Sequence, residues 1–285
     1  MPNLTDIGHI KDLLSRHGFT FSKALGQNFL INPSVCPRMA EACAAGMEGP
    51  FAVLEIGPGI GVLTRELARA AQKVVSIELD QRLLPVLEET LADCDNVEIV
   101  PGDVMKLDLA ALIREKCGGL PVAVCANLPY YITSPILMLL LESRLPVETI
   151  TVLVQKEAAQ RLCARPGTRE CGAVTLAVDY YSRADRLFQV SRGSFLPAPK
   201  VDSAVMQLHV RREPPCPVRD EKLLFRLIRA GFNQRRKTLV NSLAGAGFSK
   251  ETLQTALSKT GLAPSARAEE LTLAQFAALA DRLAE

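Results

Sequence analysis

Residues 127–135 read NLPYYITSP and directly follow the apolar run PVAVCA at 121–126. The stretch places an amide, two prolines and two adjacent tyrosines at the end of a predicted buried strand. Such groups can hold and orient a ligand. The alternative is a proline turn that begins a helix through Thr133 or Ser134, because Ser134-Pro135 is typical of a helix start.

A second candidate site is the glycine-rich stretch EIGPGIG at 55–61. Glycines at 57, 59 and 61 allow a sharp turn and let the backbone approach a ligand closely. The dinucleotide fingerprint is G-x-G-x-x-G, but here the third glycine comes one residue early and Val62 takes its expected place. The spacing instead resembles the first motif of S-adenosylmethionine-dependent methyltransferases, and it disfavours a NAD-dependent dehydrogenase.

Two acidic residues end the next two predicted strands. Glu78 can accept two hydrogen bonds from ribose hydroxyls, although a NAD enzyme would also place an acid there. Asp103 can accept from an adenine amino group. Each acid has an alternative interpretation as the N-cap of a helix. Three successive strand ends therefore offer a glycine loop and two acids, which favours a nucleoside-containing cofactor.

These residues require a regular framework, and the sequence predicts one. Short apolar runs alternate with helical patterns, which indicates a parallel sheet covered on both faces, a doubly wound α/β fold. Ligands of such folds bind beyond the carboxyl ends of the strands. The predicted strands are 51–57, 73–80, 97–103, 121–127, 149–155, 185–190 and 203–210; the predicted helices between them are 61–71, 81–91, 107–116, 134–143 and 156–164.

A proline-rich stretch, RREPPCPV at 211–218, breaks this alternation. Only helical patterns follow it. We therefore predict a boundary near residue 212, with a methyltransferase-type α/β domain over 1–212 and a small all-α domain over 213–285 that binds RNA or recognises the substrate.

Composition narrows the class of protein. The chain has 285 residues, 48% of them hydrophobic and 22% charged, and it has no apolar run of the roughly 18–20 residues that a membrane helix needs. Charged residues interrupt the N-terminus where a signal peptide needs an apolar core, so we expect a cytoplasmic protein. Eight cysteines without C-x-x-C spacing and only three histidines predict buried, reduced thiols and no metal site.

Charge is distributed unevenly along the chain. Residues 183–240 carry 13 Lys/Arg and 5 Asp/Glu, a net charge of +8, whereas the remainder carries 20 against 26, a net charge of −6. Such asymmetry predicts a polyanionic partner. One helical stripe could contact RNA phosphates, unless it is an ordinary solvated face or Gly231 interrupts the helix. The stripe comprises Lys222, Arg226, Arg229, Asn233 and Arg236; Arg235 and Lys200 are further candidates.

Six motifs, in this order and spacing, resemble the ribosomal RNA adenine dimethyltransferases, the KsgA (RsmA) family. They are KALGQNFL (23–30), EIGPGIG (55–61), IELD (77–80), GD (102–103), NLPYYITSPIL (127–137) and FLPAPKVDSAV (195–205). The resemblance extends from about residue 10 to 243. Related Erm enzymes, which methylate large-subunit rRNA, usually carry N-I-P-Y and lack PKVDSAV in this form, which favours the small-subunit enzyme.

The resemblance implies a Rossmann-like class I methyltransferase fold and S-adenosylmethionine as the cofactor. It implies transfer of methyl groups to N6 of two adjacent adenines near the 3′ end of 16S rRNA, giving N6,N6-dimethyladenosines during small-subunit biogenesis. The expected partner is an immature small ribosomal subunit, and we expect a monomer without metal or membrane. Cofactor-binding positions carried over from the family are Gln27, Asn28, Leu30, Gly57, Gly59, Gly61, Glu78, Asp103 and Asn127.

The same resemblance assigns the chemistry to NLPY. An adenine amino group is a weak nucleophile, and acceptors at its two N–H bonds stabilise the charge that develops on nitrogen. Asn127 offers its side-chain oxygen and Leu128 its carbonyl, which Pro129 holds outward. Tyr130 stacks on the flipped base. Phe195 completes the sandwich, or else it is a loop aromatic that pins Pro197 and Pro199; Tyr131 is predicted to pack.

Other functions stay open at this stage. An Erm-type enzyme that methylates 23S rRNA, or a DNA adenine methyltransferase with the same Asn-Pro-Tyr logic, would use similar residues. A non-catalytic assembly or transcription factor could keep the scaffold. The intact glycines with Glu78, Asp103 and Asn127 argue against a loss of activity.

Overall fold

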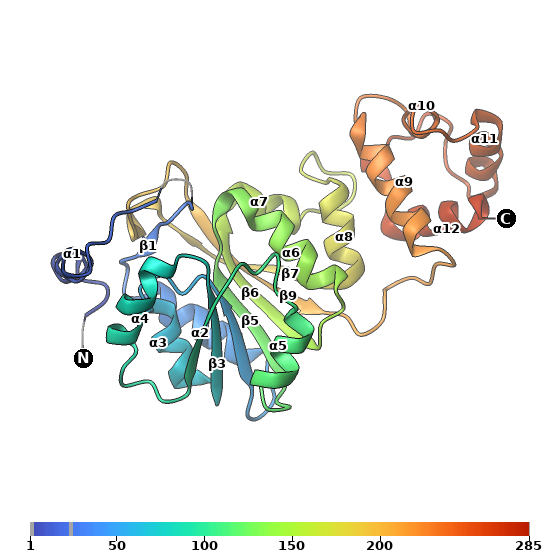
Figure 1. Cartoon of the computed structure of the whole chain (residues 1–285). Coiled ribbons are helices and arrows are strands. Elements are labelled where there is room, and N and C mark those ends of the chain that lie inside the picture. Colours follow the sequence, from blue (N-terminus) through green and yellow to red (C-terminus); the bar gives the residue numbers. More distant parts are fainter. Residues whose placement is uncertain (1–2, 23–24, 285) are drawn as a thin grey trace. The chain divides into compact units, whose positions relative to one another are not determined.

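The computed structural model describes residues 3–22 and 25–284, and its chain forms two compact units (Figure 1). The first unit contains residues up to Ala159 together with Asp185–Val210, and the second contains Gln160–Ala184 and Arg211–Glu285. The boundary predicted near residue 212 is close to the point at 210/211 where the chain passes from the first unit to the second. The prediction did not include residues 160–184 in the second unit.

A seven-stranded sheet organises the first unit. Its order is β4-β3-β2-β5-β6-β9-β7, and the first five of these strands pair in parallel, whereas β9 pairs antiparallel with β6. The mostly parallel α/β fold predicted from the sequence is confirmed. The strands are β2 (Ala52–Ile56), β3 (Lys73–Glu78), β4 (Val97–Pro101), β5 (Val122–Asn127), β6 (Val147–Gln155), β7 (Ser182–Val190) and β9 (Ser203–Val210).

The helices between the strands follow the predicted alternation. A separate two-stranded ribbon pairs β1 (Phe29–Leu30) antiparallel with β8 (Phe195–Leu196). The helices are α1 (Ile7–Arg16), α2 (Val35–Ala45), α3 (Val62–Ala70), α4 (Leu84–Thr90), α5 (Leu109–Lys116), α6 (Thr133–Glu142) and α7 (Lys156–Leu162), with short 3-10 turns at η1 (Gln81–Leu83), η2 (Tyr130–Ile132) and η3 (Arg192–Ser194).

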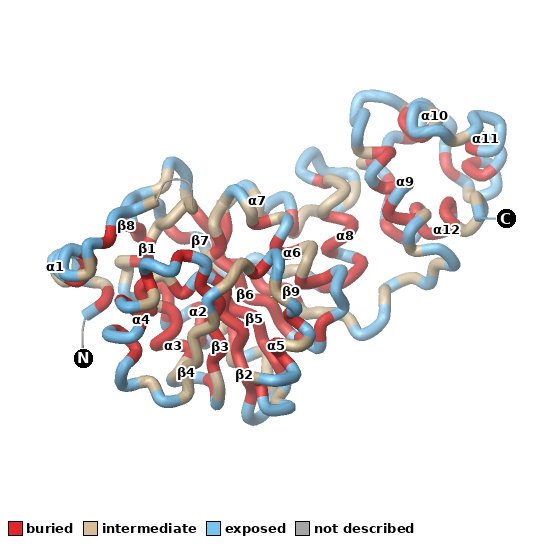
Figure 2. The backbone as a smooth tube through the Cα atoms, in the orientation of Figure 1, coloured by how far each residue is buried: buried red, intermediate tan, exposed pale blue. Residues whose placement is uncertain are grey.

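The inner strands are buried along their length, as their continuous apolar runs predict, and Figure 2 shows them in red. One apolar cluster includes Met39 of α2, Val53 of β2 and Leu67 of α3. A second cluster contains Leu13 of α1 and Leu87 of α4. The framework that carries the glycine loop is therefore fixed by apolar packing.

The second unit is helical, as predicted for the C-terminal region. It also contains α8, which the sequence did not predict; its Tyr180 and Tyr181 pack their rings against Phe225 of α9 and hydrogen bond through their hydroxyls to Glu221. Its elements are α8 (Ala173–Tyr181), α9 (Glu221–Asn233), α10 (Leu239–Ala244), α11 (Lys250–Lys259), η4 (Ala268–Glu270) and α12 (Leu273–Leu283).

All eight cysteines are described, and none of them forms a disulfide; Cys36, Cys43, Cys117, Cys125 and Cys171 are buried. Over residues 3–22 and 25–284, no three His, Cys, Asp or Glu side chains are grouped to hold a metal ion. In the same ranges, no helix has the length and apolar character needed to cross a membrane.

Candidate active site

A pocket lies at the carboxyl ends of β2, β3, β4 and β5, where the fold class predicts a ligand. It encloses about 1090 Å³ of empty space, part of it open to solvent. Most of the predicted cofactor-binding and catalytic residues line it: Gln27, Asn28, Leu30, Gly57, Gly59, Glu78, Asp103, Asn127, Leu128, Pro129 and Tyr130. Gly61 and Phe195 do not.

The glycine loop has a conformation that favours glycine. Gly57, Gly59 and Gly61 have φ values of +72°, +62° and +87°. A Cβ atom on Gly57 would meet no heavy atom within 4 Å, so the backbone borders open space there. Gly61 instead precedes α3, where a Cβ atom would lie 3.1 Å from Leu91 Cδ2. A Cβ atom on Gly59 would lie 3.2 Å from the Phe29 ring. Gly57 therefore borders the space open to a ligand, whereas Gly59 and Gly61 have packing roles.

Glu78 is fixed by two backbone donors. Its Oε1 accepts from the N–H of Asp80 at 2.7 Å, and its Oε2 accepts from the N–H of Gly59 at 3.3 Å. Burial raises the pKa of the Glu78 carboxyl to about 7. Each carboxylate oxygen can accept more than one hydrogen bond, so the side chain remains able to bind ribose hydroxyls.

Asp103 lies just after β4. Its Oδ1 accepts from the N–H of Met105 at 3.0 Å, which closes a short turn. The alternative interpretation as a helix N-cap does not hold for α5, because Asp108 caps that helix through a 2.9 Å bond from Ala111 N–H. Asp103 is therefore a pocket residue that also stabilises its own turn.

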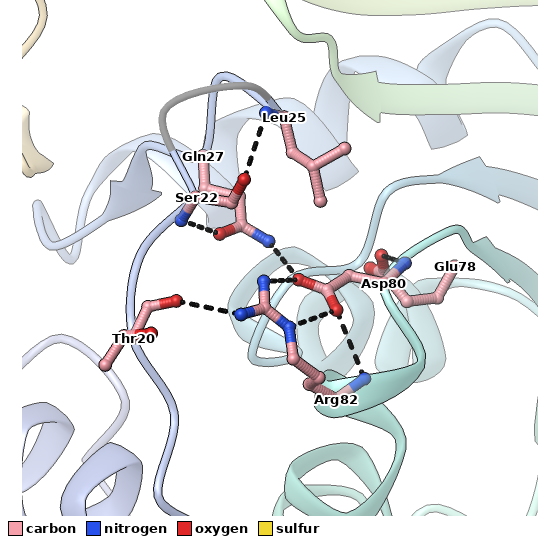
Figure 3. Close-up of polar contacts among 7 residues, drawn as sticks. All are labelled: Thr20, Ser22, Leu25, Gln27, Glu78, Asp80 and Arg82. Carbon is pink, nitrogen blue, oxygen red and sulfur yellow. Dashed lines mark hydrogen bonds and ion pairs between the residues drawn. The ribbon is translucent and has the colours of Figure 1, made fainter.

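The N-terminal segment forms one wall of the pocket. Gln27 accepts from the N–H of Ser22 at 2.8 Å and donates from Nε2 to Asp80 Oδ2 at 2.8 Å, and Figure 3 shows it between these two residues. Leu30 is buried in β1. Lys23 and Ala24, the first two residues of the KALGQNFL motif, lie outside the described residues.

Asn127 ends β5, and its amide has a defined orientation. Its Nδ2 donates to the main-chain oxygen of Asn28 at 3.1 Å. Since a carbonyl oxygen can only accept, this contact assigns the nitrogen and leaves Oδ1 as an acceptor. None of the described residues donates to Oδ1, so it is available to a ligand in the pocket.

The next residue supplies a second acceptor. The N–H of Leu128 donates to Leu153 on β6 at 3.1 Å, and no described residue donates to the Leu128 carbonyl. Pro129 accepts from Thr133 Oγ1 at 3.2 Å, where α6 begins. Both interpretations of NLPYYITSP therefore apply. Its first two residues offer unpaired acceptors at the pocket, and its last residues begin helix α6.

The two tyrosines differ. The Tyr130 hydroxyl lies 2.6 Å from Ser203 Oγ at the start of β9, and burial raises its pKa above the ordinary value. Tyr131 is 60% exposed and lies against Gly26, where a Cβ atom would be 3.3 Å from its ring. Tyr130 is thus anchored at its tip, whereas Tyr131 packs on the surface.

Phe195, the predicted second half of an aromatic sandwich, does not line the pocket. It is 2% exposed, pairs with Leu30 across the β1–β8 ribbon, and belongs to the apolar cluster that includes Met39 and Val53. The structure therefore shows Phe195 as a buried residue beside the pocket-lining Leu30, and its stacking on the base stays a prediction.

The sequence of this chain is similar to those of known rRNA methyltransferases. The model of the family described as ribosomal RNA adenine dimethylase matches residues 18–285. The "Ribosomal RNA small subunit methyltransferase A" of Geobacillus thermodenitrificans is 47% identical over 281 residues, covering 97% of this chain and 95% of the relative. The chain belongs to the ribosomal RNA adenine dimethylase family. The prediction of an S-adenosylmethionine-dependent rRNA adenine methyltransferase is confirmed at this level.

Two solved structures agree with this family. A dimethyladenosine transferase from Plasmodium falciparum is 25% identical with a TM-score of 0.73, covering 88% of this chain and 95% of that chain. The 23S rRNA methyltransferase ErmE is 29% identical with a TM-score of 0.68, covering 90% and 100%. The 29% identity to ErmE is well below the 47% identity to the small-subunit methyltransferase of Geobacillus thermodenitrificans, so the large-subunit enzyme is the more distant relative of the two.

The candidate RNA-binding residues of this dimethylase are all exposed. Lys200 lies in the first unit and the others in the second. Helix α9 continues through the buried Gly231 to Asn233, so the predicted interruption does not occur. Arg235 and Arg236 lie beyond the end of α9, so neither belongs to a stripe on that helix. The stripe is therefore limited to Lys222, Arg226, Arg229 and Asn233.

Two residues that hydrogen bond to pocket residues of this dimethylase were not singled out from the sequence. Asp80 closes the IELD motif and Ser203 lies within PKVDSAV, so each was quoted without a role. Their partners, Gln27 and Tyr130, are 53 and 73 residues away along the chain. Their place within a family motif is the one signal in the sequence that could have identified them.

Proposed function

We propose that this dimethylase transfers methyl groups from S-adenosylmethionine to N6 of two adjacent adenines near the 3′ end of 16S rRNA. The observation that carries the proposal is the pair of unpaired acceptors at the pocket, Asn127 Oδ1 and the Leu128 carbonyl. The 47% identity to a small-subunit methyltransferase supports the choice of rRNA. An immature small subunit in the cytoplasm is the proposed substrate, and the enzyme acts on it as a monomer without a metal.

The residues fit the cofactor. S-adenosylmethionine, when bound, supplies an electrophilic methyl group. The open backbone at Gly57, with Gly59 beside it in the pocket lining, accommodates its methionine part. Glu78 accepts from its ribose, and Asp103 accepts from its adenine. Gln27, Asn28 and Leu30 close the pocket from the N-terminal side.

Catalysis then depends on two acceptors and one ring. Asn127 Oδ1 and the Leu128 carbonyl accept from the target amino group and stabilise the positive charge that develops on its nitrogen. The Leu128 carbonyl is held by the β6 contact of its own N–H and by the restricted conformation before Pro129. Tyr130 stacks on the flipped base and orients it for in-line attack. No general base is needed, because the proton can leave after methyl transfer.

The test compares wild type with Asn127→Ala. Labelled S-adenosylmethionine is offered with immature small subunits, naked large-subunit rRNA and duplex DNA. We expect labelling of small subunits by wild type, with two dimethyladenosines found by mass spectrometry. Asn127→Ala should lower the rate at least about 100-fold, because it removes a charge-stabilising group, while its melting temperature shows that it folds. The exposed Asn241→Ala is the matched control and should keep full activity.

Each alternative has its own outcome. Labelling of large-subunit rRNA alone would favour the Erm-type function, for which the resemblance to ErmE gives some support. Labelling of duplex DNA alone would favour a DNA methyltransferase. Failure to bind S-adenosylmethionine at millimolar concentration would favour a non-catalytic assembly factor. Full activity in Asn127→Ala would refute the proposed role of NLPY.

A further inference from the structure

The N-terminal wall of the pocket makes a hydrogen bond to a residue that does not line the pocket itself. We define the N-terminal strap as the described residues 20–22 and 25–28. Its residues Leu25 to Asn28 border the pocket, yet the segment has no regular secondary structure and no ladder of backbone hydrogen bonds. Its position therefore depends on side-chain contacts to the framework, and the strongest of these converge on Asp80 (Figure 3).

Asp80 is only 7% exposed, and its carboxylate accepts several hydrogen bonds. Oδ2 accepts from Gln27 Nε2 at 2.8 Å and from Arg82 Nη2 at 2.6 Å. Oδ1 accepts from Arg82 Nε at 2.8 Å and from the Arg82 N–H at 3.2 Å. The bidentate pair with an arginine is a strong, charge-assisted contact.

Arg82 extends the same contact to the other end of the strap. Its Nη1 lies 3.5 Å from the Thr20 carbonyl, and its guanidinium lies over the Phe19 ring at 5.1 Å. The Arg82 guanidinium also holds the pKa of the Asp80 carboxyl below its ordinary value, so the carboxylate stays ionised at neutral pH. Asp80 thus fastens the strap at Gln27 directly and at Thr20 through Arg82.

The backbone of Asp80 reaches the cofactor acid. Its N–H donates to Glu78 Oε1 at 2.7 Å. We propose that Asp80 is a positioning residue for cofactor binding, which latches the N-terminal strap over the pocket through its carboxylate and orients Glu78 through its N–H. This inference rests on the proposed cofactor site. A wall that is already ordered lowers the entropy cost of binding, so loss of the latch should weaken cofactor affinity.

The test measures S-adenosylmethionine affinity by calorimetry in the absence of RNA. Asp80→Asn keeps the size of the side chain but removes its charge and one acceptor oxygen. We expect its Kd to rise at least about tenfold, with faster dissociation, while kcat at saturating cofactor stays within about twofold of wild type. Hydrogen exchange of the strap should accelerate. Arg82→Gln should act in the same direction, and the double variant should be less than additive.

Asp93→Asn is the matched control. Asp93 forms a similar bidentate pair with Arg65, at 2.5 and 2.7 Å, in the same unit, and neither residue lines the pocket. Its substitution should leave the cofactor Kd unchanged at temperatures well below unfolding. A rise in Kd equal to that of Asp80→Asn would show a general loss of stability and overturn the proposal.

Two further outcomes would overturn it. The first is an unchanged Kd in Asp80→Asn despite faster exchange of the strap. The second is a loss of kcat with no change in Kd. If Asp80→Asn fails to fold, Arg82→Gln decides alone, and an unchanged Kd there rejects the latch. Because the assay needs no rRNA, a wild type that binds cofactor but methylates no rRNA would refute the proposed function and not the latch.

Discussion

The hydroxyl groups of Tyr130 and Ser203 connect two motifs that are distant in the sequence. Ser203 is fully buried at the start of β9, and its Oγ lies 2.6 Å from Tyr130 Oη. A half-buried tyrosine usually needs such a partner, and the contact restricts the plane of the ring. In the proposed function, that plane is the surface on which the target adenine stacks.

We predict that Tyr130→Phe and Ser203→Ala each lower the rate of methylation by about 2- to 12-fold, the effect expected for one neutral hydrogen bond. The cofactor Kd should not change. Because both substitutions remove the same bond, the double variant should be no slower than the slower single variant. Single-turnover rates of the four proteins test this, and additive losses would contradict it.

At the residue scale, the sequence was sufficient where a position depends on local chain geometry. Asn127 lies at the pocket because it ends an apolar strand, and Gly57 because it follows one. The burial of Phe195 could not be predicted, since β8 has only two residues and its pairing with Leu30 joins segments that are distant in the sequence. Asp80 and Ser203 gained their roles from partners far along the chain.

At the scale of elements, strand β2 contains a buried carboxylic acid. Glu55 is 1% exposed; its Oε2 accepts from Ser76 on β3 at 2.6 Å, and its Oε1 has no hydrogen-bond partner in the described structure. Burial raises the pKa of the Glu55 carboxyl to about 7. The folded protein therefore binds this proton more tightly than the unfolded chain does.

Stability should consequently fall as pH rises. The contribution of Glu55 is fully present below its unfolded pKa of roughly 4.3 and is lost as pH rises through about 7. We predict that Glu55→Gln flattens the dependence of melting temperature on pH between 5 and 8, and raises the free energy of unfolding at pH 8 by about 1–3 kcal/mol.

Thermal unfolding at several pH values checks this prediction. Glu48→Gln, at an exposed position of the same unit, is the control and should keep the wild-type pH dependence. Some dependence should remain in Glu55→Gln, because Glu78 also has a raised pKa. An unchanged slope in Glu55→Gln would show that Glu55 does not titrate in this range.

Most elements were predictable because apolar patterns and turn residues agree. Helix α8 was not, since AVTLAVDYY is apolar on nearly all sides and rich in Val, Thr and Tyr, which favour strands. It also continues directly into β7. The β1–β8 ribbon was missed because two-residue strands have no detectable period.

At the scale of the whole molecule, the basic residues predicted to contact RNA differ in whether they already interact with other groups of the protein. Arg226 lies over the Phe248 ring at 4.5 Å, and Arg235 pairs with Glu269 at 3.3 Å. Lys222 and Arg229 are exposed on α9 and form no ion pair within the described residues. These two cations are therefore the best candidates for phosphate contacts.

We predict that Lys222→Gln combined with Arg229→Gln weakens binding to small-subunit RNA and reduces the slope of log K against log salt by about 1.5 to 2. The cofactor Kd should not change. Lys250→Gln with Lys259→Gln, which removes two exposed charges from α11, is the charge-matched control. Equal effects of the two pairs would indicate a general charge effect and exclude a specific contact by α9.

The division of the chain into two units was only partly predictable from the sequence. The proline-rich stretch near 212 marks the last crossing between the two units, because prolines interrupt regular elements. The earlier crossings at 159/160 and 184/185 fall inside α7 and β7, where composition does not change. These two crossings are defined by contacts between segments that are distant in the sequence, and no local sequence pattern marks them.

The discontinuous second unit has a consequence for protein engineering. A chimera made by cutting near residue 212 and attaching a relative's tail would replace α9, and with it the Phe225 ring and Glu221 carboxylate that Tyr180 and Tyr181 contact. The second unit is therefore not one contiguous C-terminal segment. A functional transplant must exchange 160–184 and 211–285 together, with three splice points.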